Sequence, residues 1–330
     1  MRTSRSLPSS RPAVSVTVVA YNSDRGLPEC LRSLQAAVRD GLAEVIVVNN
    51  GSPDQCGRIV EEEFPEVVGV KSEVNRGFAG GCNLAWPVVR GRYWLLLNPD
   101  VVVPSRGLEQ LVQWMDDEPE LGAGSPRLLD QMGRQQSVGR RFPSIPRTTA
   151  EMLRLHLLLS RARRAEVFLG SYWGGVGDHR DVDWVPGSAM IIRREVVEAV
   201  GLLSEKHHVY GEDIEWCWRI RKAGWRIGVC GSVYFRHDEG QSTLRTWGET
   251  ERKMRMWRGM YMACTQMRGS AYCRVLVMAN TLAFAVECHN PRRTAEERAR
   301  ARSDLRVHMI LLRARKLAEV RGEPEPSAVR

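Results

Sequence analysis

Polar side chains follow three short apolar segments of the chain and are candidates for a binding site. Tyr21 and Asn22 follow the first segment, Asn49 follows the second, and Asn98 and Asp100 follow the third. One polar residue after a strand usually belongs to a turn. In open α/β sheets, however, ligands bind at the carboxyl ends of the strands. Three polar strand ends on one inferred edge therefore indicate a ligand site.

A glycine-rich loop over residues 75–83 could hold an anion. Its glycines would let main-chain N–H groups approach the anion, and the N-terminus of the helix predicted after it favours negative charge. Arg76 adds a charged donor next to Gly77. The loop matches neither the dinucleotide-binding pattern nor the P-loop. A flexible surface loop is an equally good interpretation.

Two adjacent carboxylic acids, Glu212 and Asp213, stand at the start of a predicted helix. Such acids often do no more than stabilise the first turn and its dipole. Asp213 also shares a helix face with Trp216, Cys217 and Ile220, because residues three, four and seven positions apart lie on one side of a helix. This spacing places Asp213 at the rim of an apolar face, where its carboxylate can meet a substrate.

His237 is a candidate metal ligand, although a lone histidine is more often a polar residue satisfied by its neighbours. Together with carboxylates elsewhere in the chain, it makes an acceptable ligand set for a divalent ion. The eight cysteines form no C-x-x-C pair, and none lies at zinc-finger spacing with a histidine. Scattered thiols are typical of small buried side chains in a reducing compartment.

The order of the apolar segments predicts the elements that position these side chains. Strands are predicted at 14–20, 44–49, 67–74 and 93–97, and helices at 27–39, 79–89 and 108–115. This alternation of strands and helices predicts an α/β fold with a mostly parallel central sheet and helices on both faces. Further strands at 182–192 and 225–235 flank a helix at 213–223, and the pattern is helical from residue 245 onward.

Length and composition are those of a globular protein. The chain has 330 residues, of which 43% are hydrophobic and 26% charged, and this excludes a disordered chain, a collagen-like chain and a coiled-coil rod. The net charge is +9, and residues 245–330 hold eighteen basic and nine acidic side chains. We therefore predict a disordered tail over 1–12, a neutral α/β domain over 13–244 and a basic helical region over 245–330.

The basic C-terminal region has two alternative interpretations. Its first helix interleaves Arg252, Lys253, Arg255 and Arg258 with methionines and a tryptophan. This pattern is typical of an amphipathic helix on an anionic membrane surface. A helix docked on the α/β domain with a solvated basic face fits equally well. No nucleic-acid motif accompanies the charge, so no nucleic-acid partner is expected.

The chain shows no segment that predicts secretion or membrane insertion. Its N-terminus is charged but has no apolar signal core. The longest nearly unbroken apolar run, residues 275–286, is shorter than the ~20 residues that span a bilayer. We expect a cytoplasmic protein that contacts the inner membrane face, if at all, as a peripheral protein.

Taken together, these segments resemble the family 2 glycosyltransferases of GT-A fold, and within them the rhamnosyltransferase-like branch. The resemblance covers residues 13–245 and rests on an ordered series of short motifs. The series is VVAYN at 18–22, VVNNGS at 47–52, NRGFAGG at 75–81, LNPD at 97–100, WVPGS at 184–188 and YGED at 210–213, followed by Cys217, Arg219, Gly224, Trp225 and His237. It implies a glycosyltransferase domain over 13–244 and inverting transfer from a nucleoside diphosphate sugar, usually with Mg²⁺ or Mn²⁺.

The resemblance also implies roles for single residues. Asn98-Pro99-Asp100 resembles the D-x-D motif of the family, in which Asp100 would bind the metal, and His237 matches the histidine that completes the metal site in some members. Asp213 matches the catalytic base. A single base and no second nucleophilic carboxylate fit one displacement, and hence inversion.

The remaining matched positions belong to the donor and acceptor sites of the family. The nucleotide-binding positions are Tyr21, Asn22, Asn49, Arg76, Gly77 and Asn98, and the positions around the acceptor and donor sugar are Trp184, Gly187 and Glu212. Asn49 stands where an aspartate is usual, which leaves the nucleotide base open. The membrane interpretation of the C-terminal region would suit a lipid-linked saccharide acceptor. The chain has no Q-x-x-R-W motif in register, so we expect transfer of one sugar per binding event.

Two other functions remain open at the level of the sequence. A non-catalytic scaffold that binds sugars or nucleotides would explain why asparagines 49 and 98 stand where acids are usual. A nucleotidyltransferase could use a similar sheet, but the chain shows no triphosphate loop with a lysine. Turnover of a sugar donor would distinguish the enzyme from the scaffold, and pyrophosphate release would identify the nucleotidyltransferase.

Overall fold

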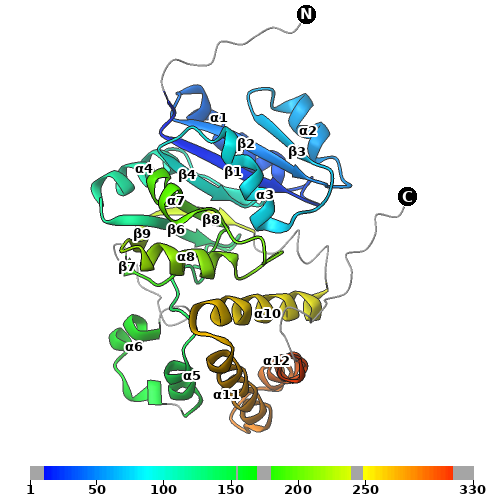
Figure 1. The fold of residues 1–330 in the computed structure, drawn as a ribbon, viewed down its shortest axis with the longest axis vertical. Coiled ribbons are helices and arrows are strands. Elements are labelled where there is room, and N and C mark those ends of the chain that lie inside the picture. Colours follow the sequence, from blue (N-terminus) through cyan, green and yellow to red (C-terminus); the bar gives the residue numbers. More distant parts are fainter. Residues whose placement is uncertain (1–10, 154, 169–179, 239–247, 315–330) are drawn as a thin grey trace, which may run out of the picture.

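The computed structural model describes residues 11–153, 155–168, 180–238 and 248–314, and one sheet of nine strands runs through its α/β part (Figure 1). Residues 1–10 of the predicted tail lie outside the described residues, as do both ends of the predicted basic region. The strands are β1 (Val14–Ala20), β2 (Ala43–Asn50), β3 (Val68–Ser72), β4 (Tyr93–Leu97), β5 (Val101–Val102), β6 (Leu121–Leu129), β7 (Arg180–Asp181), β8 (Ala189–Arg193) and β9 (Arg226–His237).

The sheet has the order β3-β2-β1-β4-β8-β6-β9-β5, with β7 paired to β9. Its first four strands are parallel. All seven residues of β1 and all five of β4 are buried, as expected for strands covered on both faces. From β8 onward the sheet is mixed, because β8 runs antiparallel to both β4 and β6. The predicted α/β fold is confirmed, and its second half adds the antiparallel pairs.

Helices cover the sheet and form a separate group at one end of the molecule (Figure 1). They are α1 (Leu27–Arg39), α2 (Cys56–Glu63), α3 (Gly77–Ala85), α4 (Gly107–Asp117), α5 (Ile145–Met152), α6 (Arg161–Phe168), α7 (Arg194–Val200), α8 (Glu212–Lys222), α10 (Glu249–Arg268), α11 (Ser270–His289) and α12 (Ala295–Arg313). Short 3-10 helices lie at Trp86–Val88 (η1) and Leu155–Leu158 (η2). The helix predicted over 79–89 begins at Gly77 and ends at Ala85, because Pro87 cannot donate the next main-chain hydrogen bond.

Helix α8 is anchored to the sheet by buried aromatic side chains. Trp216 of α8 is fully buried and meets Trp94 of β4 edge-to-face, with ring centroids 5.9 Å apart. Its indole N–H donates to the carbonyl of Gly201. Arg219 pairs with Glu215 through two hydrogen bonds of 2.8 and 2.9 Å. These contacts fix the helix whose first turn carries Asp213.

Helix α10 connects the sheet to the last two helices. Met260 of α10 packs against both the main core and a second apolar cluster formed with α11 and α12. Inside that cluster, the hydroxyl oxygen of Tyr261 lies 2.8 Å from His308 Nε2. The same oxygen accepts a hydrogen bond from Asn280 Nδ2. Lys253 forms ion pairs with Glu249 and with an aspartate of α12. The first helix of the basic region is therefore docked on the rest of the molecule.

Within the described residues, α11 is the one helix that is long and apolar enough to cross a membrane by length and composition alone. The apolar run at 275–286 that was noted in the sequence is shorter than this helix, which extends over twenty residues. One side of α11 is packed inside the second cluster through Cys273, Leu276 and Val277. Burial of this side is typical of a helix in a bundle.

The closest approach between α10 and the α/β part occurs at two glycines. Gly211 has a φ of +95°, and a Cβ on it would lie 2.3 Å from the carbonyl oxygen of Gly259. A Cβ on Gly259 would lie 2.1 Å from the carbonyl oxygen of Tyr210. Both neighbours are main-chain atoms, so neither can rotate away. The N-terminus of α8 and the middle of α10 can therefore lie in contact only because neither glycine carries a side chain.

We expect Gly259→Ala to lower the free energy of unfolding by about 1–3 kcal/mol, because the new methyl group must push α10 away from Tyr210. Urea denaturation followed by circular dichroism measures this change. Gly69→Ala is the matched control, since nothing lies within 4 Å of a Cβ at that position. Equal effects of both substitutions would contradict the close approach of α10.

Candidate active site

The carboxyl ends of β1, β2 and β4 lie on one edge of the sheet because the three strands are parallel. Ala20 pairs with Asn49, and Val18 pairs with Leu97. This register brings together Tyr21, Asn49 and Asn98, which are 77 positions apart in the chain at most. The strand ends singled out in the sequence therefore form one edge of a common site.

The loops after β1 and β2 are tied to each other. The N–H of Asn22, a residue with φ of +50°, donates to Ser52 Oγ at 2.8 Å. Asn49 Oδ1 accepts a hydrogen bond from the N–H of Ser52 at 3.0 Å. Asp54 accepts from Ser52, Cys56 and Asp24; burial would raise its pKa, but these hydrogen bonds hold the pKa below its ordinary value. Asp54 thus organises the loops after β1 and β2 as an anion.

The glycine-rich loop is held in place by Asn50 at the end of β2. This buried amide accepts from the N–H of Arg76 and donates to Asn75 Oδ1 and to the carbonyl of Gly77. Gly77 has a φ of +71°, and a Cβ there would lie 1.9 Å from the carbonyl oxygen of His208. Only glycine fits this position. Arg76 is exposed at the N-terminus of α3.

Asp100 and His237 lie side by side because β5 pairs with the end of β9, placing Val101 opposite His237. Asp100 Oδ1 is 3.5 Å from His237 Nε2, and Asn98 Nδ2 is 3.4 Å from the same nitrogen. Asp100 Oδ1 is buried, and no described group hydrogen-bonds to it. Among the described residues, no cluster of three His, Cys, Asp or Glu side chains could hold a metal.

Gln136 fixes the tautomer of His237, and sequence analysis missed it. Gln136 Nε2 donates to the carbonyl of His237 at 2.9 Å, so Gln136 Oε1 is the atom 2.8 Å from His237 Nδ1. An amide oxygen can only accept, so Nδ1 carries the hydrogen and Nε2 presents its lone pair toward Asp100. The only sequence signal was an unexplained polar segment after β6, a strand that was not predicted.

The turn before β8 connects the Asp100 side of the site to Asp213. The N–H of Asn98 donates to the carbonyl of Ser188 at 2.9 Å. The N–H of the preceding Gly187 donates to Asp213 Oδ2 at 3.3 Å. The two carboxylates on which the sequence analysis depended are thus brought to one region by a single turn.

Glu212 and Asp213 are adjacent but lie in different environments. Glu212 is buried, and no described group hydrogen-bonds to its Oε2. Burial, and then the charge of Asp213, raises the pKa of Glu212 well above its ordinary value. Burial also raises the pKa of Asp213, but the amides of Ile214 and Gly187 and the charge of Arg140 oppose this rise. The two acids therefore titrate as a pair, in which Asp213 has the amide donors and the positive charge that favour its ionised form.

Trp184 lies three residues before Gly187, whose N–H donates to Asp213. Its indole N–H donates to the carbonyl of Arg141, and the guanidinium of Arg140 lies 5.2 Å from its ring centroid. Gly187 follows in the same turn, where a Cβ would lie 2.7 Å from the ring of Phe78. Arg140 was not singled out in the sequence, because its position beside Asp213 depends on pairing with Trp184.

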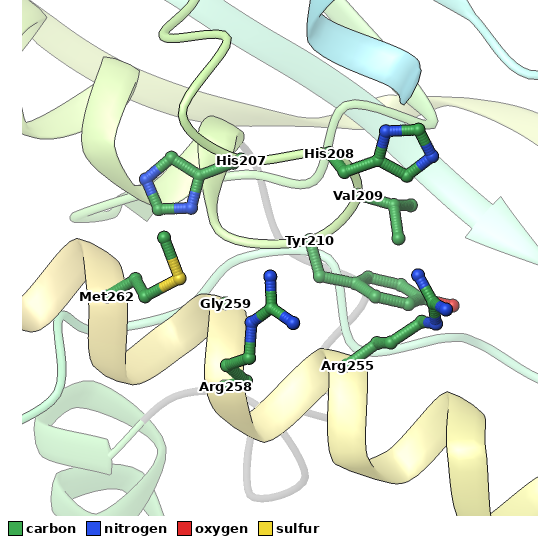
Figure 2. Close-up of a pocket in the computed structure, with 8 residues that line it drawn as sticks. All are labelled: His207, His208, Val209, Tyr210, Arg255, Arg258, Gly259 and Met262. Carbon is green, nitrogen blue, oxygen red and sulfur yellow. The ribbon is translucent and has the colours of Figure 1, made fainter. Parts of the chain in front are cut away.

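A recess lies between residues 207–210 and α10, beside the N-terminus of α8. Arg255 and Arg258 of α10 line it together with His208 and Tyr210 (Figure 2). Arg255 forms an ion pair with Glu251 at 2.6 Å. Burial, and then the charge of Arg255, lowers the pKa of Arg258. Two guanidinium groups close together favour an anionic group in this recess.

Comparison with known proteins gives the class to which this fold and site belong. The family model "Glycosyl transferase family 2" matches residues 15–168, and the model "Glycosyl transferase family 21" matches residues 172–294. A mannosyltransferase from Pyrobaculum calidifontis, solved with GDP-mannose and Mn²⁺, superposes with a TM-score of 0.59 at 17% identity. That superposition covers 92% of this chain and 88% of the mannosyltransferase. The fold is the GT-A fold of glycosyltransferases.

Two relatives agree with this class. An N-acetylglucosaminyl-diphospho-decaprenol L-rhamnosyltransferase of Mycobacterium tuberculosis is 26% identical over 245 residues, which are 70% of this chain and 77% of the relative. A low-salt glycan biosynthesis hexosyltransferase of Haloferax volcanii is 26% identical over 230 residues, which are 68% of this chain and 67% of the relative. These matches support a family 2 glycosyltransferase, as the sequence predicted, and indicate a glycosyltransferase enzyme. This likeness favours the enzyme over the scaffold and the nucleotidyltransferase.

We expect Glu212→Gln to raise the free energy of unfolding relative to the wild type at neutral and alkaline pH. The native state keeps a proton on Glu212 that the unfolded chain releases near pH ~4.3. Wild-type stability therefore falls as pH rises from that value to the raised native pKa, by about 1.4 kcal/mol for each pH unit. A glutamine cannot ionise and avoids this loss.

Urea denaturation at a series of pH values measures the difference between the two proteins. Glu61→Gln, on the exposed side of α2, is the control and should follow the wild type. Parallel pH profiles for wild type and Glu212→Gln would show that Glu212 is ionised in the native protein.

Proposed function

We propose that the protein transfers one sugar, a deoxyhexose such as rhamnose, from a nucleoside diphosphate sugar to a hydroxyl group of a lipid-linked glycan, with inversion at the anomeric carbon. The observation that carries the proposal is the turn at Gly187 and Ser188, which joins Asp213 to the strand end that bears Asp100. The names of the two relatives support glycan acceptors and hexose donors.

The donor nucleotide would lie along the edge formed by Tyr21, Asn22 and Asn49. Its diphosphate would face the glycine-rich loop, where the N-terminus of α3 and the exposed Arg76 favour negative charge. Asn49 is an amide rather than a carboxylate, so base recognition there would use hydrogen bonds without charge.

Asp100 and His237 would hold a divalent cation, Mg²⁺ or Mn²⁺. The buried, unsatisfied Oδ1 of Asp100 and the lone pair of His237 Nε2 face each other and fit such an ion. Cations of this kind are commonly held by one or two protein ligands together with phosphate oxygens of the substrate. When bound, the ion supplies positive charge to the departing nucleoside diphosphate.

Asp213 would act as the general base. Its carboxylate takes the proton of the acceptor hydroxyl while the acceptor oxygen bonds to the anomeric carbon. The bond from that carbon to the diphosphate oxygen breaks with its electron pair, and the nucleoside diphosphate leaves. Glu212 is buried, so its carboxyl group is not open to the substrate as a second nucleophile. One displacement from the opposite side gives inversion.

The acceptor would lie between Trp184 with Gly187 and the recess beside α10. Tyr210 lines that recess and is three residues from Asp213, so an acceptor at its mouth would be close to the base (Figure 2). A lipid-linked acceptor places the enzyme at the cytoplasmic face of a membrane.

The proposal is tested by incubating the purified protein and Mn²⁺ with UDP-, dTDP- and GDP-sugars and a lipid-diphosphate saccharide acceptor. Released nucleoside diphosphate identifies the donor, and NMR of the product gives its anomeric configuration. We expect release with a deoxysugar donor and an inverted linkage. A retained configuration, or no transfer with any donor, would overturn the proposal.

We expect Asp213→Asn to lower kcat by about 10²–10⁴-fold, since it removes the base and keeps the shape of the side chain. Glu61→Gln, on the exposed side of α2, is the control and should keep the wild-type activity. In the wild type, kcat/KM should fall at acid pH, with a midpoint above the ordinary aspartate pKa of ~3.9, because burial raises the pKa of Asp213. Full activity of Asp213→Asn would exclude Asp213 as the base.

We expect Gln136→Leu to weaken Mn²⁺ binding by about 10–100-fold, because His237 loses the acceptor that fixes its tautomer. Isothermal titration of Mn²⁺ into the protein with a saturating nucleoside diphosphate measures the affinity. Gln131→Leu, an exposed glutamine five positions earlier, should bind like the wild type. Unchanged affinity of Gln136→Leu would show that Gln136 does not position His237.

A further inference from the structure

Helix α11 presents an apolar stripe to solvent. Val275, Met278, Leu282 and Val286 are 48%, 54%, 55% and 51% exposed. Their spacing places them on one face of the helix. The other face is buried in the second apolar cluster against α10 and α12. An amphipathic helix in a globular protein normally turns its apolar side inward, but α11 is apolar on both sides.

Neighbouring elements extend this stripe. Leu155, Leu157 and Leu158 of η2 and Met309, Ile310 and Leu312 of α12 are also exposed. Of the seventeen large hydrophobic side chains exposed among the described residues, eleven lie in α11, α12 and the segment from Leu153 to Leu158. Figure 1 shows α5, α11 and α12 together, on the far side of α10 from the sheet. Such a concentration marks an interaction surface.

The charge around this surface is positive. Residues 270–313 contain eight arginines and four acidic residues. All four of those acids already form ion pairs, Glu287 and Glu297 with Arg293, Glu296 with Arg300, and Asp304 with Lys253. The apolar stripe therefore lies in a surface with excess positive charge.

We propose that the α11 stripe, with η2 and the exposed side of α12, docks on the surface of a membrane that contains anionic lipids. The exposed apolar side chains would enter the boundary between headgroups and acyl chains, and the arginines would meet the headgroup phosphates. A second copy of the chain is a poorer occupant, because two faces with the same positive charge repel.

Helix α11 docks on the membrane surface and does not cross the membrane. Crossing would remove its inner side from the second cluster, where Leu276 and Val277 are buried. It would also break the hydrogen bond from Asn280 to Tyr261. With its inner side retained, only the outer side of the helix is available to lipid.

Helix α10 contacts both this surface and the active site. The same helix contacts Tyr210 and Gly211 through Gly259 and packs against α11 through the second cluster. Docking of α11 would thus hold the recess beside Asp213 near the headgroup layer. This connection rests on the proposed function, whereas membrane docking itself does not.

The test is flotation of the full chain with vesicles of phosphatidylcholine alone or mixed with phosphatidylglycerol. We expect binding to the mixed vesicles, weakened by high salt, and at least about a tenfold loss of bound protein for the double variant Met278→Glu/Leu282→Glu. Met132→Glu is the control, because Met132 is 77% exposed on the turn after β6 and far from α11. Since the substituted side chains are exposed, the circular dichroism spectra should match.

Three outcomes would overturn the proposal. The first is unchanged vesicle binding by the double variant. The second is a wild-type dimer in light scattering that the double variant converts to a monomer, which would assign the stripe to a second copy. The third is release from membranes by detergent but not by alkaline carbonate, which would make α11 a spanning helix. Transfer to a water-soluble acceptor analogue should be equal in the wild type and the double variant, which separates failure of docking from failure of the proposed function.

Discussion

The site depends on one constraint, the turn at residues 186–188 between β4 and α8. Because β8 pairs antiparallel with β4, the residue before β8 meets the residue after β4, and Ser188 accepts from Asn98. The next residue back, Gly187, donates to Asp213. Two carboxylates more than a hundred positions apart in the chain therefore share a scaffold of main-chain hydrogen bonds. Main-chain contacts of this kind keep their geometry when side chains move, which suits a site in which a base and a cation must act on one substrate.

The first turn of α8 shows how burial gives two adjacent carboxylic acids different states. Glu212 turns into the protein, near Cys82 of α3, and loses its hydration, and no described group hydrogen-bonds to its Oε2. Asp213 turns toward Gly187 and keeps two amide donors and the field of Arg140. The direction of each side chain follows from the left-handed Gly211, which is itself fixed by its contact with Gly259. The electrostatics of the site thus depend on a packing contact with α10, an element beyond the sheet.

The sequence was sufficient to predict the elements whose signal is local. Segments such as YWLLL at 93–97 are apolar throughout and coincide with β4, and the polar residues after them mark the binding edge. Strand β6, LGAGSPRLL, was missed because its glycines and proline have low strand propensity, and it is a strand only because β8 and β9 lie on either side of it. Gln136 was missed for a related reason, since its partner His237 is 101 positions away.

The C-terminal helices show why an amphipathic pattern does not by itself identify the surface that meets a membrane. The methionines and arginines of α10 suggested a lipid-facing helix, yet Met254 is buried and Arg255 is paired with Glu251. Met256 of α10 is 38% exposed, but the larger exposed apolar face is on the next helix. Leaving a Leu or Met side chain half exposed forgoes roughly 1 kcal/mol of burial, so four on one face are costly in water alone. Since α10 already covers the inner side of α11, the exposed side gains stability only from a further apolar environment, and the arginines around it select one with negative charge.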